Sequence, residues 1–452
     1  MPSAMEMNGG QPTYRSILRL VWPLALGMVN NAVMQFVDRA YLANDSLRAL
    51  EAVLPAGMLM WIFAGFFQSV VGYSSVFVGQ YHGAGDVAKC RTTCRVALVL
   101  AAVFGILSVP LVPLGNFLLS LTSASGALLE DERTYYSIML AGAVFVYGQM
   151  AAASYFTGRG QTRLVFWIGL AGNLVNAALD PLLIFGWGGL PRLGIAGAAY
   201  ATVAAMAVQT AVLCLLAHRD LCRAPASRTG EAREIAGRIL RFGLPSGAFT
   251  TLNLLSFTIF VFVTGGIGDL ELAVSNACFT VNYLLFAPME GFALGASTLV
   301  AQAIGRGDPG AAALAARRTI LLGVGFVAVL ALLVLAFMRP ILDLFASGAG
   351  EAAAKFHALG RTLFLVMFAW LLFDAASAIL SGALKGTGDT KFVMGWLLVG
   401  SFFIWLPLVF AVRRFHNTMP ALWGTLVVDV CVLFFGTWVR WRRGKWKEIR
   451  LV

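Results

Sequence analysis

Charged residues are scarce in this chain. They make up 12% of its 452 residues, and 59% of the residues are apolar, whereas a soluble protein usually has about 25% charged residues. So few charged side chains cannot cover the surface of a globular protein of this size, which excludes a water-soluble fold. The composition predicts an all-α polytopic membrane protein, because each transmembrane helix needs about 20 apolar residues.

Groups needed for intramembrane or ATP-driven chemistry are also missing. The chain has only four histidines, all in loops or at the ends of predicted spans, and neither an HExxH nor a GxSxG motif occurs. No phosphate-binding P-loop occurs, and the six cysteines show no zinc-type spacing. An intramembrane enzyme is therefore a weaker hypothesis than a transporter, and neither a cofactor nor a structural metal is expected.

Windows of about 20 apolar residues predict twelve transmembrane spans. They are 17–43, 50–79, 96–119, 135–157, 164–186, 195–217, 237–264, 271–303, 318–345, 360–384, 392–412 and 421–441. Most of the 33 Lys and Arg residues lie in loops on the side of both termini, which is cytoplasmic by the positive-inside rule. The net charge of +11 thus reflects topology and not nucleic-acid binding. We expect a monomeric, multi-pass protein of the cell inner membrane, surrounded by lipid.

The two halves of the chain repeat one another. Gln80 aligns with Gln302, the run GAGD at 83–86 aligns with GRGD at 305–308, and TGRGQTR at 157–163 aligns with KGTGDTK at 385–391. We predict two six-helix bundles, residues 1–218 and 239–452, joined by a cytoplasmic linker at 219–238. Because both copies have the same topology, a pseudo-two-fold axis along the membrane normal should relate them across a central cleft.

These motifs, in this order, resemble the multidrug and toxic compound extrusion (MATE) family, and most closely its bacterial DinF-like branch. They are the run from Pro23 to Asp38, QYHGAGD at 80–86, the TGRGQTR loop with NLVNAALDPLL at 173–183, AQAIGRGD at 301–308 and GALKGTGDTK at 382–391. The resemblance covers nearly the whole chain. It implies secondary active efflux of amphiphilic, often cationic small molecules by alternating access, coupled to an inward flow of protons or sodium ions.

Two carboxylates in the first half are accompanied by amides. Steps of three and four residues place Asn31 with Asp38 on one helix face, and Asn176 with Asp180 on another. Such a pair either holds a proton or, with amide oxygens, binds a hard cation such as Na⁺. The resemblance implies that Asp38, Asn176 and Asp180 form the coupling-ion site, with Asn31 and Thr202 as further members. The alternative is a buried polar network that fixes helix packing.

The second half departs from one family pattern, because Asn253 stands where many relatives carry a Glu on the seventh span. This favours proton over sodium coupling. Asp374 matches a family acid on the tenth span, whereas we interpret Asp429 as structural. Glu290, the repeat counterpart of Gln68, either takes a proton, holds a cationic substrate or is a neutral structural group. An apolar substrate cavity beside these acids is predicted to be lined by Phe279, Tyr283, Phe286, Met289 and Trp370.

Two further hypotheses concern motion and cargo. Pro23 in the first span is a candidate hinge, since a proline within a helix frees a carbonyl group and permits bending, although a static kink is the alternative. A flippase for lipids or lipid-linked sugars, from the same wider superfamily, is the main alternative function. Flippases of that kind often line their cleft with Arg or Lys, and no basic residue lies near the middle of a predicted span.

Overall fold

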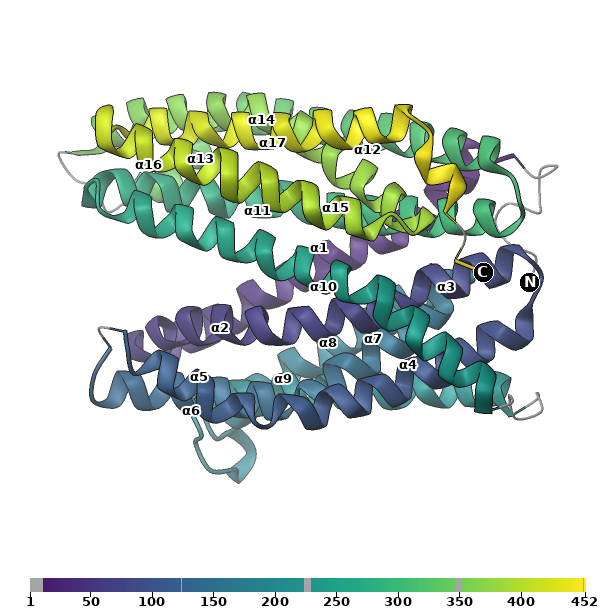
Figure 1. The fold of residues 1–452 in the computed structure, drawn as a ribbon. Coiled ribbons are helices and arrows are strands. Elements are labelled where there is room, and N and C mark those ends of the chain that lie inside the picture. Colours follow the sequence, from purple (N-terminus) through teal and green to yellow (C-terminus); the bar gives the residue numbers. More distant parts are fainter. Residues whose placement is uncertain (1–10, 123, 223–228, 347–351, 450) are drawn as a thin grey trace.

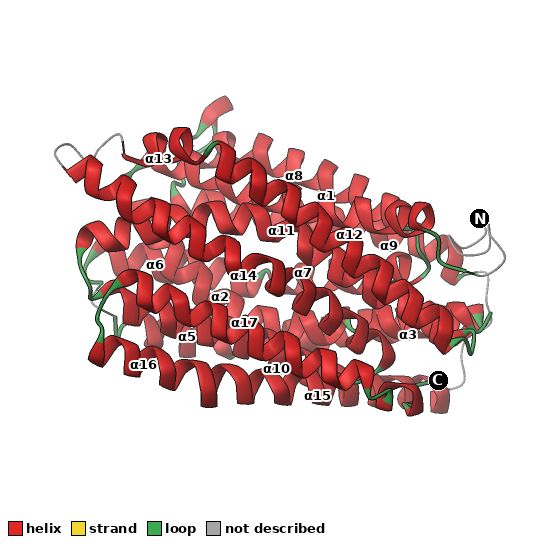
Figure 2. Ribbon diagram, turned by 90° about the horizontal axis from the view of Figure 1, so that it is seen from above, coloured by secondary structure: helices red, strands yellow, loops and turns green. Residues whose placement is uncertain are grey.

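The computed structural model describes residues 11–122, 124–222, 229–346, 352–449 and 451–452. Within these residues the chain is almost entirely helical, and twelve helical segments are long and apolar enough to cross a membrane. This confirms the predicted all-α fold with twelve transmembrane helices. The long helices run side by side along one common direction (Figure 2).

The first lobe contains the first six spans. They are α1 (Tyr14–Asp45), α2 (Leu47–Gly72) with α3 (Ser74–Gly83), α4 (Val87–Ser108) with α5 (Leu111–Leu119), α6 (Ala127–Ala141) with α7 (Ala143–Gly158), α8 (Thr162–Ile184) and α9 (Ile195–Leu221). A short 3₁₀ turn, η2 (Trp187–Gly189), lies between α8 and α9. Several spans therefore consist of two consecutive helices where hydropathy predicts one continuous segment.

The second lobe follows. It contains α10 (Thr229–Gly265), α11 (Asp269–Gly305), α12 (Pro309–Ala336) with α13 (Met338–Ala346), α14 (Ala353–Thr387), α15 (Thr390–Leu397) continued by the π-helical η4 (Leu398–Trp405) and α16 (Leu406–Phe415), α17 (Met419–Arg442) and η5 (Lys445–Glu448). The predicted linker at 219–238 falls at the join between the lobes, where α9 ends at Leu221 and α10 begins at Thr229. Residues 223–228 of that linker lie outside the described residues.

The helices α1 and α10 cross between the two lobes (Figure 1). Ile17 and Leu20, near the start of α1, pack in the core of the second lobe, whereas Leu42 packs in the first. The helix α10 does the reverse, because Ile235 packs in the first lobe and Phe260 in the second. This exchange of helix ends is the arrangement expected if a pseudo-two-fold axis relates the two copies.

Small residues allow the helices of the second lobe to approach one another closely. Gly382 and Gly386 of α14 are four residues apart, and a Cβ atom on either would overlap the backbone of α11, at Ala293 and Ser297 respectively. Gly291 of α11 is in the same position against α1. Without a hydrophobic driving force between helices in lipid, contacts of this kind carry much of the packing energy.

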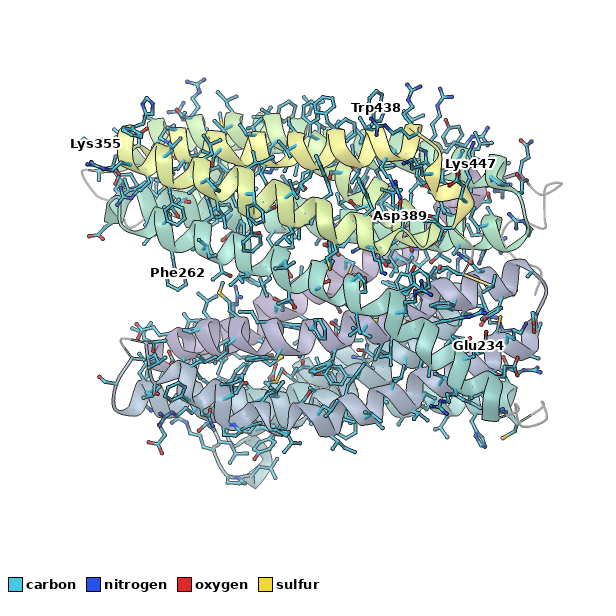
Figure 3. The ribbon with its side chains drawn as sticks, viewed as in Figure 1. Glu234, Phe262, Lys355, Asp389, Trp438 and Lys447 are labelled. Carbon is cyan, nitrogen blue, oxygen red and sulfur yellow. The ribbon has the colours of Figure 1, made fainter. Side chains whose placement is uncertain are left out.

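The lobes lie close together at one end and diverge toward the other. The chain begins and ends at the close end (Figure 1). Toward the other end, Phe262 of α10 is 80% exposed and projects into the space between the lobes (Figure 3). The molecule is therefore closed on the side of its termini and open on the opposite side.

Candidate functional site

The carboxyl groups of Asp38 and Asp180 meet between α1 and α8. They lie within hydrogen-bonding reach of each other. Asp38 is half-buried and Asp180 is 0% exposed. Asp38 Oδ1 and Asp180 Oδ2 are both buried, and neither has a hydrogen-bond partner among the described residues. Two carboxylates facing each other in a low-dielectric interior repel, so the arrangement needs a proton or another cation between them.

Amide side chains extend this site along the groove between α1 and α8. Asn176 is 4% exposed, and its Nδ2 donates to Asp180 Oδ1 at 3.1 Å. Nearer the closed end, Asn173 Nδ2 donates to Asn31 Oδ1 at 3.2 Å. The structure thus brings Asp38, Asp180, Asn176 and Asn31 into one polar groove, as their spacing in the sequence predicts.

Thr202 is not joined to this groove. It lies on α9, and its hydroxyl donates to Ala198 O of the same helix at 3.0 Å. Within the described part of the chain it makes no hydrogen bond to Asp38 or Asp180. The hydroxyl satisfies a carbonyl of its own helix, which is a common use of Thr in a helix interior.

Sequence reasoning missed Tyr135 at this site. Tyr135 lies on α6, within electrostatic reach of both Asp38 and Asp180. The available signal was the tyrosine pair at 135–136, but the sequence does not show which ring faces α1 and α8. Tyr136 points the other way and donates its hydroxyl to Leu111 O at 2.9 Å. Tyr135 is therefore the one of the two that can interact with the acids.

A second group of acids lies inside the second lobe. Asp374 on α14 is within electrostatic reach of Asp429 on α17 and of Glu290 on α11. Asp429 Oδ1 accepts a hydrogen bond from Ser401 Oγ at 3.1 Å, at the π-helical segment η4. The structure thus joins Asp429, which we interpreted as structural, to the acids that the sequence had already singled out.

Glu290 is exposed although it lies in the interior of the 37-residue helix α11. A lysine accompanies it, because Lys385 on α14 is within electrostatic reach of Glu290. Lys385 Nζ lies 3.7 Å from the ring centroid of Phe249 on α10. The charged neighbours of Glu290, Lys385 and Asp374, both lie on α14 within the second lobe. The predicted tenth span ended at residue 384, whereas α14 continues to Thr387, so Lys385 belongs to the span.

Two candidates of the second-lobe group are not brought to these acids. Gln68 is half-buried on α2 and Asn253 is exposed on α10. Neither side chain makes a hydrogen bond within the described residues. The repeat relation between Gln68 and Glu290 therefore reflects equivalent positions in two lobes and not a direct contact.

The predicted aromatic lining is partly wrong. Met289 is 0% and Trp370 is 3% exposed, so both belong to the hydrophobic core of the second lobe. Phe279 stacks on Trp423, with ring centroids 4.5 Å apart. Tyr283 is exposed and accepts a hydrogen bond from Gln35 Nε2 across the lobe boundary at 3.2 Å. Phe279 and Phe286 are half-buried, so Tyr283 alone of the five predicted lining residues is exposed.

At the closed end, two glutamines connect the lobes. Gln80 Nε2 of α3 donates to Gly386 O of α14 at 3.1 Å, and Gln302 Nε2 of α11 donates to Gly158 O of α7 at 2.8 Å. Both glutamines are almost completely buried. These reciprocal bonds, which we call the glutamine clasp, close the molecule on the side of its termini.

The family model described as MatE matches residues 23–182 and 245–411. The chain belongs to the MATE family. The two matched ranges contain the polar groove of the first lobe and both Glu290 and Asp374 of the second. They exclude Asp429 and the segment after α17, for which membership of the family gives no expectation.

Relatives of known name and structure agree with this assignment. The chain is 28% identical over 428 residues to the "Probable multidrug resistance protein NorM" of Bradyrhizobium diazoefficiens, covering 93% of this chain and 91% of that protein. A MATE protein solved in complex with MaL6 superposes with a TM-score of 0.84 at 21% identity, covering 99% of this chain and 100% of the other. A MATE family transporter solved in an outward-facing conformation gives a TM-score of 0.81 at 22% identity, covering 98% and 97%. These structures establish that the chain has the MATE fold.

Proposed function

We propose that this MATE protein exports amphiphilic, chiefly cationic small molecules by alternating access, in exchange for protons that enter the cell. The observation that carries the proposal is the contact between Asp38 and Asp180. One proton placed between two buried carboxyl groups removes their mutual repulsion. Proton release restores that repulsion, so the occupancy of the pair is coupled to the geometry of α1 and α8.

Proton coupling is favoured over sodium coupling by the ligands in the groove. A sodium ion needs several oxygen ligands, yet the Asn176 amide donates to Asp180 and the Thr202 hydroxyl donates to its own helix. A proton needs only the two carboxyl groups of Asp38 and Asp180, whereas Na⁺ would need further oxygen ligands from Asn176 and its surroundings.

The direction of transport follows from the charge distribution. From the positive-inside rule we propose that the closed end, with both termini, is cytoplasmic and that the open end faces outward. Proton entry across about 100 mV releases roughly 2.3 kcal/mol, which would drive export of an uncharged molecule against a concentration ratio of about fiftyfold. The one-for-one exchange of a proton for a monocation moves no net charge, so the pH gradient drives it. We further propose that the molecule works as a monomer of the inner membrane, because each copy contains both lobes and a complete groove.

Pro23 is a candidate hinge within α1. The helix α1 is continuous across Pro23 in the present conformation. Residues on both sides of Pro23, from Ile17 to Ala25, pack in the core of the second lobe, and Asp38 lies about four turns farther along the helix. Bending at Pro23 would move Asp38 relative to α8. We therefore propose Pro23 as the hinge that responds to the proton.

The name of a curated relative supports drug-like small molecules as the cargo, and the carboxylate of Glu290 supports a positive charge on them. The relative is named for multidrug resistance. Glu290 is exposed inside the molecule, where a carboxylate favours a cationic substrate. We assign Glu290, together with Asp374, to substrate recognition in the second lobe.

One observation favours the alternative of a lipid or lipid-linked-sugar flippase. Lys385 places a cation inside the bundle, where such a protein would hold a phosphate group. The carboxylate of Glu290 lies within electrostatic reach of this lysine and compensates its charge. We therefore rank export of cationic or zwitterionic molecules above transport of phosphorylated lipids.

The decisive experiment is efflux of a cationic dye in inverted membrane vesicles, with each ion gradient imposed separately. A pH gradient without sodium should drive uptake of dye into the vesicles, and an uncoupler should stop it. Uptake that requires a sodium gradient would contradict proton coupling. Failure of both gradients, with transport of a fluorescent lipid instead, would favour the flippase.

A further inference from the structure

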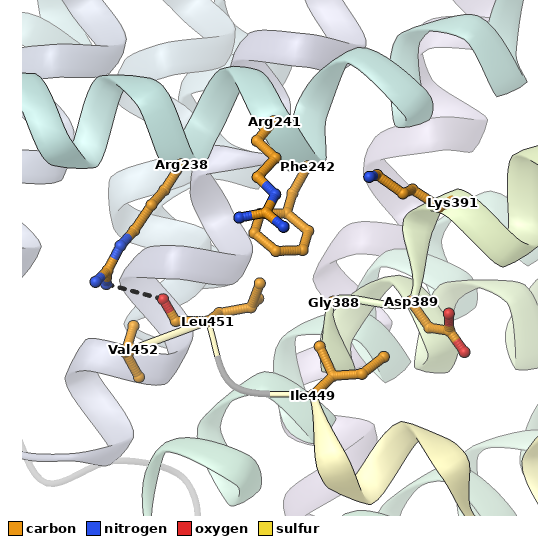
Figure 4. Close-up of a pocket in the computed structure, with 9 residues that line it drawn as sticks. All are labelled: Arg238, Arg241, Phe242, Gly388, Asp389, Lys391, Ile449, Leu451 and Val452. Carbon is orange, nitrogen blue, oxygen red and sulfur yellow. Dashed lines mark hydrogen bonds between the residues drawn. The ribbon is translucent and has the colours of Figure 1, made fainter.

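A cavity of about 530 Å³ lies at the closed end of the molecule, outside the polar groove and the second-lobe acids (Figure 4). One wall is α10, which packs on the first lobe here through Ile235 and Ile239. The opposite wall is the start of α15 in the second lobe, and Ile449, Leu451 and Val452 line a third side. The cavity is therefore built from both lobes.

Two cations in the cavity have no acidic partner. Arg241 of α10 and Lys391 of α15 project into it from the two walls (Figure 4). Both side chains are exposed, and neither forms an ion pair within the part of the chain that the structure describes. Each therefore offers its full charge and its hydrogen-bond donors to an anion.

Two further charged side chains of the cavity are already paired. Arg238 Nη2 lies 2.6 Å from Glu234 Oε1, and Arg238 Nη1 donates to Leu451 O at 3.0 Å. The Asp389 carboxylate is bound by Arg440, with Nε and Oδ2 separated by 2.7 Å. Figure 4 shows this carboxylate turned away from the cavity. Among the side chains that line the cavity, the unpaired charge is consequently positive, and it comes from Arg241 and Lys391.

The remaining lining is apolar. Phe242 of α10 and Ile449, Leu451 and Val452 of the final segment contribute hydrocarbon surface. Leu451 is only 3% exposed and packs in a core cluster of the first lobe. A site that combines two free cations with hydrocarbon suits an amphiphilic anion better than an inorganic one.

The depth of the cavity matches the level of lipid headgroups. At 1.5 Å per residue, Arg241 lies roughly 36 Å of helix from Gly265, the far end of α10. The hydrocarbon core of a bilayer is about 30 Å thick. Lys391 lies in the first turn of α15, at the same end of the molecule. Both cations are thus at the depth where the phosphate groups of one leaflet lie.

We propose that this cavity binds the phosphate group of an anionic phospholipid from the leaflet on the side of the termini. Arg241 and Lys391 bind the phosphate oxygens, which charge-assisted hydrogen bonds favour, and the apolar wall contacts the glycerol and the first acyl carbons. Because Arg241 lies on the part of α10 that packs on the first lobe, whereas Lys391 lies on α15 of the second lobe, the bound lipid bridges the lobes and stabilises the conformation that is closed at this end.

The test is lipid binding to the purified full chain, measured by native mass spectrometry and by the thermal unfolding midpoint. Phosphatidylglycerol should bind and raise the midpoint, whereas phosphatidylcholine should do neither. In the variants Arg241→Gln and Lys391→Gln, we expect phosphatidylglycerol binding to weaken about tenfold each, roughly 1.4 kcal/mol. Arg233→Gln is the matched control, because Arg233 is an exposed cation on the same end of α10 that does not line the cavity.

Three outcomes would overturn the proposal. Undiminished phosphatidylglycerol binding in both single variants would exclude the cavity as the site. If Arg233→Gln weakened phosphatidylglycerol binding as much as the two cavity variants, the binding would depend on the general surface charge and not on the cavity. Binding of inorganic phosphate that is lost in the same two variants and displaces phosphatidylglycerol would assign the site to a free anion and refute the lipid. Lys391 makes no ion pair to another described residue, so Lys391→Gln should fold. A loss of lipid binding in this variant can therefore be attributed to the site and not to misfolding.

Discussion

Gln80 and Gln302 occupy equivalent places in the two lobes, and each donates a hydrogen bond to a backbone carbonyl of the other lobe. Their acceptors, Gly386 O and Gly158 O, are also equivalent in the repeat. The clasp therefore obeys the pseudo-two-fold symmetry of the whole molecule. An alternating-access transporter must break such bonds to open on this side, so the clasp sets part of the energy difference between the two states.

The clasp predicts that Gln80→Ala and Gln302→Ala will loosen the closed end. Each change leaves a buried carbonyl without its donor, which costs about 1–3 kcal/mol. The measurement is the labelling rate of a cysteine placed at Ala301, which is 0% exposed at this interface. We expect faster labelling by an impermeant maleimide in inverted vesicles for either variant.

Gln209→Ala is the control for the clasp. Gln209 is equally buried, but it accepts a hydrogen bond from Gln149 within the first lobe. Labelling at position 301 should remain slow in this variant. If it rises as much as in the clasp variants, the effect is general destabilisation and the clasp has no special part in closure.

The carboxyl pair predicts the outcome of Asp38→Asn. The variant keeps the shape of the side chain but removes the charge that makes proton binding necessary. Coupled dye efflux should be lost, while the unfolding midpoint stays the same or rises because the repulsion from Asp180 is gone. Proton-driven efflux at the original rate would remove Asp38 from the mechanism.

The transmembrane fold and most residues of the polar groove could be predicted from the sequence, because both depend on the spacing of apolar and polar residues along the chain. Apolar runs predicted all twelve spans, and three- and four-residue steps predicted that Asn31 would share a groove with Asp38. The role of Tyr135 could not be predicted, since an uncharged ring carries no signal until its neighbours are known. Lys385 fell just outside the predicted tenth span because the polar run KGTGDTK at 385–391 lowers the hydropathy there, whereas the helix α14 continues to Thr387.

Tyr135→Phe tests the residue that the sequence did not reveal. Removing its hydroxyl should slow proton-coupled efflux about tenfold if that group donates to the acids in one of the two states, the equivalent of roughly 1.4 kcal/mol. Tyr136→Phe is the matched control: it loses the bond to Leu111 O and about 1 kcal/mol of stability, with efflux unchanged. Equal efflux in both variants would leave Tyr135 without a function.

The packing of α14 predicts a contrast between two glycines. A methyl group at Gly386 would overlap the backbone carbonyl of Ser297, whereas nothing lies within 4 Å of a methyl group at Gly395. Gly386→Ala should therefore unfold or fail to accumulate in the membrane. Gly395→Ala should be neutral or stabilising by up to about 1 kcal/mol, the usual preference for Ala in a helix. Detergent-extracted yield and thermal unfolding measure both, and equal stability would show that α11 and α14 can separate freely.

Lys385→Gln distinguishes the two kinds of cargo. In an exporter of cations, the change leaves Glu290 uncompensated, so the interior becomes more negative and the KM for a monocationic dye should fall several-fold. In a flippase, the same change removes the group that holds the phosphate, and transport of the lipid should disappear. Efflux of a cationic dye and translocation of a fluorescent lipid, measured in parallel with the unchanged chain, separate these outcomes. A rise in the KM for the cation would contradict the assignment of Glu290 to substrate recognition, because the loss of a neighbouring positive charge can only strengthen the attraction of that carboxylate for a cation.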